Sequence, residues 1–375
     1  MRTRFRDLAA GLALLALNGK ALRAQVPVVS LGGPVGELSE PFSQVSGVRE
    51  LGDGRVVVTD MTEFVIKLAD FDRDRLTEVG RHGGGPGEYQ IPFGLVPLPG
   101  DTSMVFDIGN GRFLLLDPDG TPGTTPTMRG LGQFQIPRFA DGAGRLYFTA
   151  GSSFGAGGSD SIPIWRYDRA TGLIDTVARL KVPVMKAAAA GSGGVQMQLG
   201  GATVGMPKQV PFQPRDAWAV SPDGLVAVVR VADYHVEWWG AGEPVIGPPV
   251  DYQPVPVTEA DKRSARDNAP RATIATSGGG TQTVHMPQAD ESEWPSRKPP
   301  FAGRAALVAP DGRLWVSRNR RAGEAPLYDV FDGSGVLVRQ VAFPPDTKLV
   351  GFGRDHLYVT WTDDDGLVRL RRYRG

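Results

Sequence analysis

The chain has no cysteine among its 375 residues, so it can form neither a disulfide framework nor a lipid-modified cysteine. No uninterrupted apolar run reaches the roughly 18 residues that a membrane-spanning helix needs, so we expect no membrane anchor. Neither sign of charge is in excess, because 41 lysines and arginines balance 41 aspartates and glutamates. This balance argues against a nucleic acid or an anionic surface as partner.

The first residues have the layout of a secretory signal peptide. Arg2, Arg4 and Arg6 precede the apolar run Leu8 to Leu17, and the small residue Ala24 follows. A basic start, a short apolar stretch and a small residue at the cleavage point are typical of such peptides. We therefore expect removal of residues 1–24 and export of residues 25–375 to the periplasm or the extracellular space, as one domain.

Tight turns recur along the rest of the chain, in keeping with its 50 glycines and 31 prolines. Each of the first set of turns separates two short apolar runs, and an aspartate-glycine pair in that position is a strong hairpin signal. These turns are Asp53-Gly54, Gly100-Asp101, Asp141-Gly142, Asp223-Gly224, Asp311-Gly312 and Arg354-Asp355. A second set, such as Asp117 to Gly120 and Asp332 to Gly335, follows in most units. Each unit therefore reads as four antiparallel strands.

The spacing of these turns predicts a six-bladed β-propeller. The separations are 47, 41, 82, 88 and 43 residues, and the three short values match the period of four-stranded blades arranged radially. We interpret the two long gaps as insertions at about 185–211 and 251–300, although a seventh or eighth blade is the alternative. The second insertion contains a capped polar helix from Thr258 to Ala269, whose few apolar positions suggest a weakly anchored flap.

The two ends of the chain are expected to meet in one blade. The last unit supplies three strands, near 349–352, 356–361 and 367–373, and then stops. The extended segment Val26 to Leu31 has no unit of its own. Pairing it with the last strand would close the ring and cover two sheet edges.

The glycine-rich stretch at residues 80–92 (GRHGGGPGEYQIP) connects the first unit to the second. Gly80, Gly83, Gly87-Glu88-Tyr89 and Pro92 resemble, in this order, the crossing segment of NHL-repeat and related six-bladed β-propellers. The resemblance implies the fold rather than an activity. A phosphate-binding loop is excluded, because such a loop needs a helix at the glycines and here a strand follows.

Signals for catalysis are sparse. No Gly-x-Ser-x-Gly elbow occurs. His82, His235 and His285 could share one face of the ring and hold zinc, as three histidines do in some lyases of this fold. Lactonase-type propellers use a carboxylate and asparagines around a metal, and candidate loop residues here are Asp60, Glu63, Asp107, Asn110 and Asp233. All of these are also ordinary turn or strand-end residues, and the Asp363 to Gly366 run fits a plain hairpin rather than a calcium loop.

The sequence therefore predicts an exported, monomeric, non-enzymatic module that binds a protein or a small ligand on one face of the ring, with no cofactor and no bound metal. The alternatives are a metal-dependent hydrolase or lyase of the lactonase or amidating-lyase type, and a structural component of the cell envelope. Trp294 in the second insertion either anchors that insertion to the ring or docks a partner. The residues predicted to contact a ligand are His82, Asp107, Asn110, Asp233, Trp294 and Arg318.

Overall fold

The structure is a computed structural model. It describes residues 26–126, 128, 130–131, 135–149, 160–181, 195–199, 202–206, 208–267, 269, 271–275, 281–285 and 288–375. The predicted signal peptide, residues 1–24, lies outside these residues. Among the described residues, no helix has the length and apolarity required to cross a bilayer.

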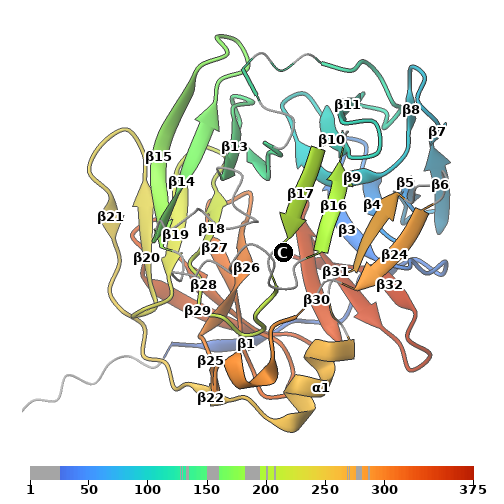
Figure 1. Cartoon of the computed structure of the whole chain (residues 1–375). Coiled ribbons are helices and arrows are strands. Elements are labelled where there is room, and N and C mark those ends of the chain that lie inside the picture. The colour runs from blue at the N-terminus through green and yellow to red at the C-terminus, as the bar shows by residue number, and fades with distance from the viewer. Residues whose placement is uncertain are drawn as a thin grey trace, which may run out of the picture.

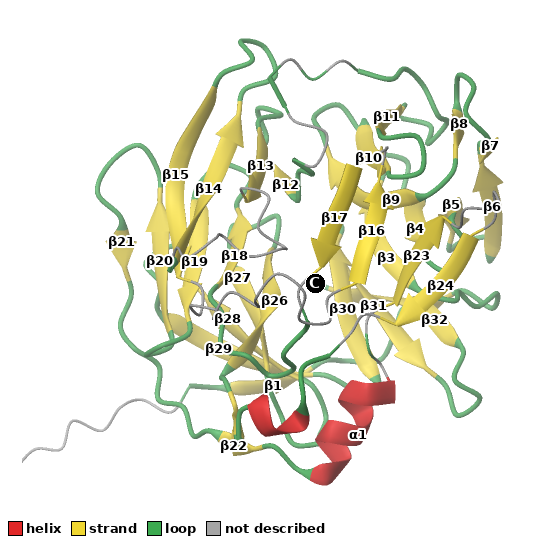
Figure 2. Cartoon of the chain, in the orientation of Figure 1, coloured by secondary structure: helices red, strands yellow, loops and turns green. Residues whose placement is uncertain are grey.

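The fold is an all-β propeller of six antiparallel blades, as the turn spacing predicts. Strands make up nearly all of its regular structure, with helix confined to one edge of the view in Figure 2. Blade 1 contains β3 (Val45–Glu50), β4 (Val56–Asp60), β5 (Val65–Asp70) and β6 (Arg75–Val79). Blade 2 contains β9 (Pro92–Pro97), β10 (Ser103–Asp107) and β11 (Arg112–Leu116). Blade 3 contains β12 (Phe139–Ala140), β13 (Leu146–Thr149), β14 (Ser161–Tyr167) and β15 (Ile174–Lys181).

The second half of the ring follows the same order (Figure 1). Blade 4 contains β18 (Ala217–Val220), β19 (Val226–Arg230), β20 (His235–Trp239) and β21 (Val245–Ile246). Blade 5 contains β26 (Phe301–Val308), β27 (Leu314–Arg318), β28 (Leu327–Phe331) and β29 (Leu337–Ala342). Blade 6 contains β30 (Thr347–Phe352), β31 (His356–Thr362) and β32 (Val368–Arg374).

The core lies between neighbouring blades. Each blade is covered on both faces, so its second strand is a continuous apolar run rather than an alternating one. In β4, Val56, Val57 and Val58 are all fully buried. Val57 packs toward blade 2, whereas Val56 and Val58 pack in the cluster shared with blade 6. Burial on both sides fixes the angular position of every first strand around the axis.

The N-terminal segment closes the ring, but with residues other than those predicted. The segment expected to pair with the last strand contains β1 (Val28–Ser30), which instead pairs in parallel with β29 on the outer edge of blade 5. The fourth strand of blade 6 is β2 (Gly36–Glu37), which pairs with β32. Leu38 and Phe42 continue this pairing through backbone bonds to Leu370 and Val368, and both side chains are buried. The predicted residues were wrong because extended character alone does not show which segment has side chains that can be buried. Leu38 and Phe42 are buried next to the last strand, and β1 pairs elsewhere.

The long gaps hold insertions, not blades. The first carries the hairpin of β16 (Val195–Leu199) and β17 (Ala202–Met206). The second carries β22 (Val255–Pro256), α1 (Glu259–Asp267), β23 (Arg271–Ala275), β24 (Thr281–His285), the short helix η2 (Glu291–Glu293) and β25 (Arg297–Lys298). The two insertions meet, because β16 contacts β23. Both connect the last strand of one blade to the first strand of the next, so they leave the ring on the same side.

The helix of the second insertion is anchored through polar contacts. The sequence predicts a weakly anchored flap because it considers only the few apolar positions of the helix. Thr258 and Asp261 cap α1 by reciprocal hydrogen bonds. Asp261 is buried, and its Oδ1 lies 2.6 Å from Nζ of Lys298, which is buried as well. The Trp294 ring is also buried and donates its indole N–H to the carbonyl of Ala289. The buried ion pair and the buried indole stabilise the insertion internally, and Lys298 ties it to blade 5 by donating to the carbonyl of Arg320.

Candidate functional site

The first strands of the blades form an inner ring around the axis. β3 contacts β9 and β30, β12 contacts β9 and β18, and β18 contacts β26. In a propeller, residues of these strands and of the loops that lead into them reach the axis. Ala302, Arg304 and Lys348 lie on β26 and β30 and are exposed, so solvent reaches the inner ring.

An enlarged bulge in β26 carries one of these exposed residues. Phe301 pairs with Arg318 and Ala306 pairs with Val316, so β26 advances five positions while β27 advances two. The three extra residues lie between Phe301 and Ala306, a stretch that contains Arg304. Bulges re-aim side chains and are frequent beside functional sites. Here the bulge displaces Arg304 from the regular alternation of the strand.

Two further arginines lie where the neighbouring first strands begin. Arg138 precedes β12 and donates its backbone N–H to Tyr147, and Arg215 precedes β18. Gly303 in the β26 bulge is so close to Arg215 that a Cβ on it would lie 3.3 Å from the Arg215 Cβ. We call Arg138, Arg215 and Arg304 the inner-ring arginines. They come from three consecutive blades and belong to the same end of the ring.

The charges of two inner-ring arginines, Arg138 and Arg304, are close enough to interact. Burial, and after it repulsion from the Arg304 guanidinium, lower the pKa of Arg138 to about 9. Burial also lowers the pKa of Arg215. The Arg138 guanidinium lies 4.9 Å from the ring centre of Phe139 and 5.7 Å from that of Trp218, so its face rests on aromatic rings rather than on a carboxylate.

Within the described part of the chain, none of the inner-ring arginines forms an ion pair. Arg215 donates from Nη2 and Nε to Oε1 of Gln213, at 2.8 and 3.3 Å, and this neutral amide orients it without cancelling its charge. Arg230 in the same blade differs, because it pairs with both Asp216 and Glu237. Unpaired like charges oppose folding, so their retention at one place points to a ligand of opposite charge.

Sequence reasoning missed these three residues. One available signal was the repeated entry into first strands, Ile91-Pro92-Phe93 and Ile136-Pro137-Arg138-Phe139, with Gln213-Pro214-Arg215 as a shorter form. The extra residue in the last two is an arginine. No sequence signal marks Arg304, because its placement depends on the β26 bulge.

The six predicted ligand residues do not come together. Asp107 is fully buried and accepts the backbone N–H groups of Gln90 and Ile91. Asn110 donates to Asp107 and to the Gly83 carbonyl. Both side chains therefore fix the crossing between blades 1 and 2, where His82 lies exposed on β7 (Arg81–His82) beside β8 (Glu88–Tyr89).

The remaining three lie elsewhere in the ring. Asp233 is half exposed and its Oδ1 lies 2.7 Å from Nδ1 of His235 in blade 4. Arg318 pairs with the buried Asp329 and lies over the rings of Tyr234 and Tyr252. Trp294 is buried inside the second insertion. Whether any of the six contacts a ligand stays a prediction, but no single ligand-sized site joins them.

The glycine-rich crossing loop satisfies its own polar groups. The Glu88 carboxylate accepts the Gly85 N–H and the Arg81 guanidinium. Arg112 donates to the carbonyls of Gly84, Gly85 and Glu88. A Cβ on Gly83 would lie 2.1 Å from Oε2 of Glu88, so glycine is required for this packing. The loop is a structural crossing, and its concave side is filled by its own carboxylate.

The candidate metal ligands are not arranged around a common point in the described part of the chain. In the part of the chain that the structure describes, no group of three or more histidine and carboxylate side chains is placed to hold an ion. His235 contacts Asp233 and Glu237, whereas His82 belongs to the crossing between blades 1 and 2. Asp60, a lactonase-type candidate, is fully buried and accepts backbone N–H groups of Ser43 and Gln44.

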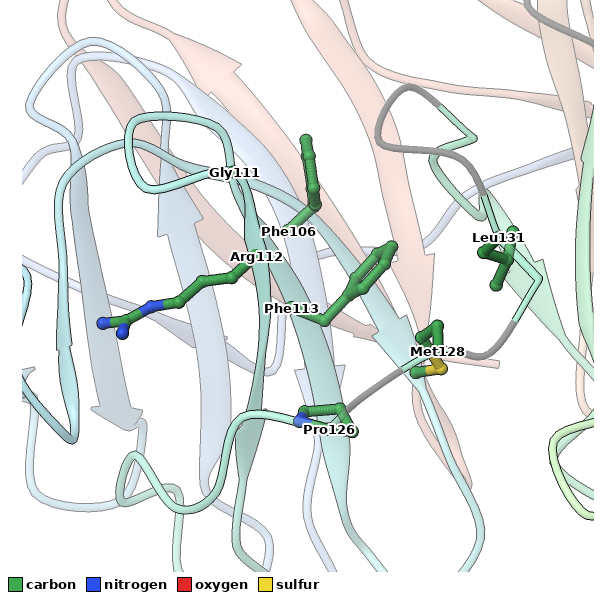
Figure 3. A pocket seen from close by; sticks show the side chains of 7 residues that line it. All are labelled: Phe106, Gly111, Arg112, Phe113, Pro126, Met128 and Leu131. Carbon is green, nitrogen blue, oxygen red and sulfur yellow. The ribbon is translucent and has the colours of Figure 1, made fainter. Parts of the chain in front are cut away.

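A separate pocket of about 260 Å³ lies against blade 2 (Figure 3). Its lining consists of Phe106, Gly111, Arg112, Phe113, Pro126, Met128 and Leu131. Figure 3 shows the Arg112 side chain extending away from the apolar side chains of the lining. Its guanidinium is engaged by the crossing loop, because it donates to the carbonyls of Gly85 and Glu88.

No protein-family model matches the sequence, and the search of curated proteins finds no match. Solved structures match over nearly the whole chain. Regucalcin from Agrobacterium tumefaciens, a calcium-binding protein, is 14% identical with a TM-score of 0.43, covering 94% of this chain and 97% of that one. A gluconolactonase from Xanthomonas campestris is 11% identical with a TM-score of 0.45, covering 92% and 98%. A luciferin-regenerating enzyme is 13% identical with a TM-score of 0.43, covering 92% and 96%.

These comparisons correct the expected function. The expectation of a non-enzymatic binding module is wrong on this comparison, since two of the three similar proteins are enzymes. At these identities and TM-scores, the likeness carries no argument about the reaction or the substrate.

Proposed function

We propose that the protein is an enzyme, a hydrolase or a lyase, and that its active site lies at the inner-ring arginines. The observation that supports this proposal is a group of three guanidiniums from three consecutive blades, none of which forms an ion pair in the part of the chain that the structure describes. The formal charge of the whole chain is zero, so the group does not follow from a basic composition. A concentrated positive field in a neutral protein is suited to an anionic substrate.

The chemistry of both reaction classes fits such a site. Hydrolysis of an ester or lactone places negative charge on the former carbonyl oxygen, and elimination next to a carboxylate places it on an enolate oxygen. Fixed cations stabilise these charges more than they stabilise the substrate, which lowers the barrier. Arginine supplies charge and N–H donors rather than protons, and Arg138 stays protonated at neutral pH even with its pKa lowered to about 9.

The proposal assigns no step to a metal. The sequence suggests a metal-dependent enzyme as an alternative, but the described residues hold no group of side chains that fits a metal. We propose further that residues 25–375 act as one exported, monomeric domain on a small molecule. The signal-peptide layout of residues 1–24 and the NHL-like crossing segment at residues 80–92 support export and family resemblance, respectively.

The test is turnover by purified residues 25–375. A panel of carboxylate-bearing lactones and esters is assayed by acid release, and a panel of β-substituted acids by the absorbance of the new double bond. We expect at least one class to turn over, and Arg304→Gln to lower kcat/KM about a hundredfold or more. Arg313→Gln is the matched control, because Arg313 is exposed and paired with Asp311 in the turn after β26. Absence of turnover in both panels, or turnover that survives Arg304→Gln, would overturn the proposal.

A further inference from the structure

The three inner-ring arginines lie at the end of the ring where the first strands begin, and together they carry more positive charge than one carboxylate would neutralise. Two carboxylates, Asp216 directly before β18 and Glu50 on β3, are already engaged by other groups. Asp216 accepts the Arg230 guanidinium and the N–H groups of Lys181 and Val231. Glu50 accepts hydrogen bonds from Tyr358 and from the Arg354 N–H. Neither carboxylate is available to the inner-ring arginines.

Resting on the proposed function, we infer that the substrate is a small dianion, with two negative charges shared among Arg138, Arg215 and Arg304. A monoanion would leave two neighbouring guanidiniums uncompensated, and the repulsion between Arg138 and Arg304 would persist. A dianion removes that repulsion and leaves one net positive charge. Lys348, exposed on the neighbouring first strand β30, adds to the same field.

The contacts of two of the arginines leave their donors available for such a ligand. The Arg138 guanidinium lies over the Phe139 and Trp218 rings, and among the described residues it forms no ion pair, so its N–H groups can bind an oxyanion in the bidentate manner. Gln213 occupies Nε and Nη2 of Arg215, which leaves Nη1. Arg304 projects from the bulge that packs against Arg215. The three side chains therefore come from neighbouring blades, with Arg215 beside the bulge that carries Arg304 and Arg304 within electrostatic reach of Arg138.

The inference is tested by calorimetric titration of residues 25–375 with acetate, malonate, succinate and inorganic phosphate at fixed ionic strength. We expect the dianions to bind at least about tenfold more tightly than acetate, since a hydrogen bond to a charged group contributes about 1.5–3 kcal/mol. Succinate and malonate above phosphate would indicate a dicarboxylate, and the reverse order a phosphate ester. Equal affinity for acetate and the dianions would overturn the inference.

Three variants sharpen the test. Arg304→Gln should abolish the preference for dianions, Arg304→Lys should retain part of it, and Arg313→Gln should leave it unchanged. Without ligand, Arg304→Gln should melt at the same or a higher temperature than the wild type, because it relieves repulsion with Arg138. A melting temperature several degrees lower would make Arg304 a structural residue and overturn the inference.

The two proposals can fail separately. Dianion-selective binding without turnover in either substrate panel would refute the enzyme and keep the ligand class. Turnover of monoanionic substrates as efficient as that of matched dianionic ones, lost in Arg304→Gln, would keep the enzyme and refute the ligand class.

Discussion

Glu50 shows how one side chain joins the first and last blades. It lies on β3 of blade 1, and its carboxylate accepts hydrogen bonds from the Tyr358 hydroxyl at 2.5 Å and the Arg354 N–H at 3.2 Å, both from blade 6. Nδ1 of His356 lies 3.2 Å away. A Cβ on Gly353 would lie 2.0 Å from Oε2 of Glu50, so only glycine permits this approach. The junction between the blades therefore depends on a charged carboxylate.

This contact predicts a loss of stability in acid. Burial alone would raise the pKa of Glu50, but the hydrogen bonds from Tyr358, the Arg354 N–H and His356 outweigh it and the pKa is lowered. A carboxyl with a lowered pKa stabilises the fold above its unfolded-state pKa, about 4.3 for glutamate, and this contribution is lost as pH falls through the folded value. We expect the difference in unfolding free energy between wild type and Glu50→Gln to be constant from pH 7 to 5 and to shrink below about pH 4.3. Urea titrations across this range check it, and a difference that does not change with pH would contradict it.

The inner-ring arginines mark the limit of prediction at the scale of residues. The sequence places Arg138 and Arg215 beside prolines at the start of first strands, which the turn pattern locates. It does not reveal that Arg304 belongs with them, because that depends on three extra residues in β26 relative to β27. The predicted site residues were polar residues at strand ends, and several of these, such as Asp60 and Asp107, instead hold backbone N–H groups.

At the scale of elements, the N-terminal segment shows that extended character alone does not decide which strand pairs with the last strand of the ring. Both β1 and the stretch from β2 to Phe42 are short and extended, and the sequence offers no register for either. Val28 and Val29 in β1 are exposed, whereas Leu38 and Phe42 enter the core shared by blades 1 and 6. The segment with side chains that fill that core is the one that closes the ring.

Closure by the second segment predicts unequal effects of two similar substitutions. Leu38→Ala should lower the free energy of unfolding by about 2–5 kcal/mol, because it removes a fully buried side chain. Val29→Ala in β1 should change it by less than about 0.5 kcal/mol, since that side chain is 49% exposed. Urea denaturation of both variants measures the two values. Comparable losses would mean that β1 and not the second segment carries the closure.

The second insertion shows a different failure of prediction. The apolar positions Ala260, Ala265 and Ala269 suggested a helix without a strong anchor. The actual anchor is Lys298, which pairs with the buried Asp261 37 positions away and donates to the carbonyl of Arg320 in blade 5. The spacing of apolar residues along a helix shows in the sequence whether the helix has an apolar face to bury. A single polar contact to a residue far away in the sequence produces no such spacing, so it could not be predicted.

At the scale of the whole molecule, the architecture could be predicted because its signals are local and repeated. Turns between apolar runs mark each blade in the sequence. Several turn glycines, such as Gly54 and Gly312, adopt the positive φ that such turns require. A function depends instead on which residues converge at the axis from different blades. In a chain with zero formal charge, the closed ring brings together three arginines that have no ion pair among the described residues, and the sequence alone does not show this grouping.

The most direct test of the central claim, that the inner-ring arginines bind an oxyanion, is diffraction at the selenium edge from crystals of residues 25–375 soaked in selenate. Selenate is a small dianion, and its selenium gives an unambiguous anomalous peak. We predict a peak within hydrogen-bonding distance of at least two of Arg138, Arg215 and Arg304, and its loss in crystals of Arg304→Gln. Selenate bound only elsewhere on the molecule, or a peak at the inner ring that persists in Arg304→Gln, would contradict the claim.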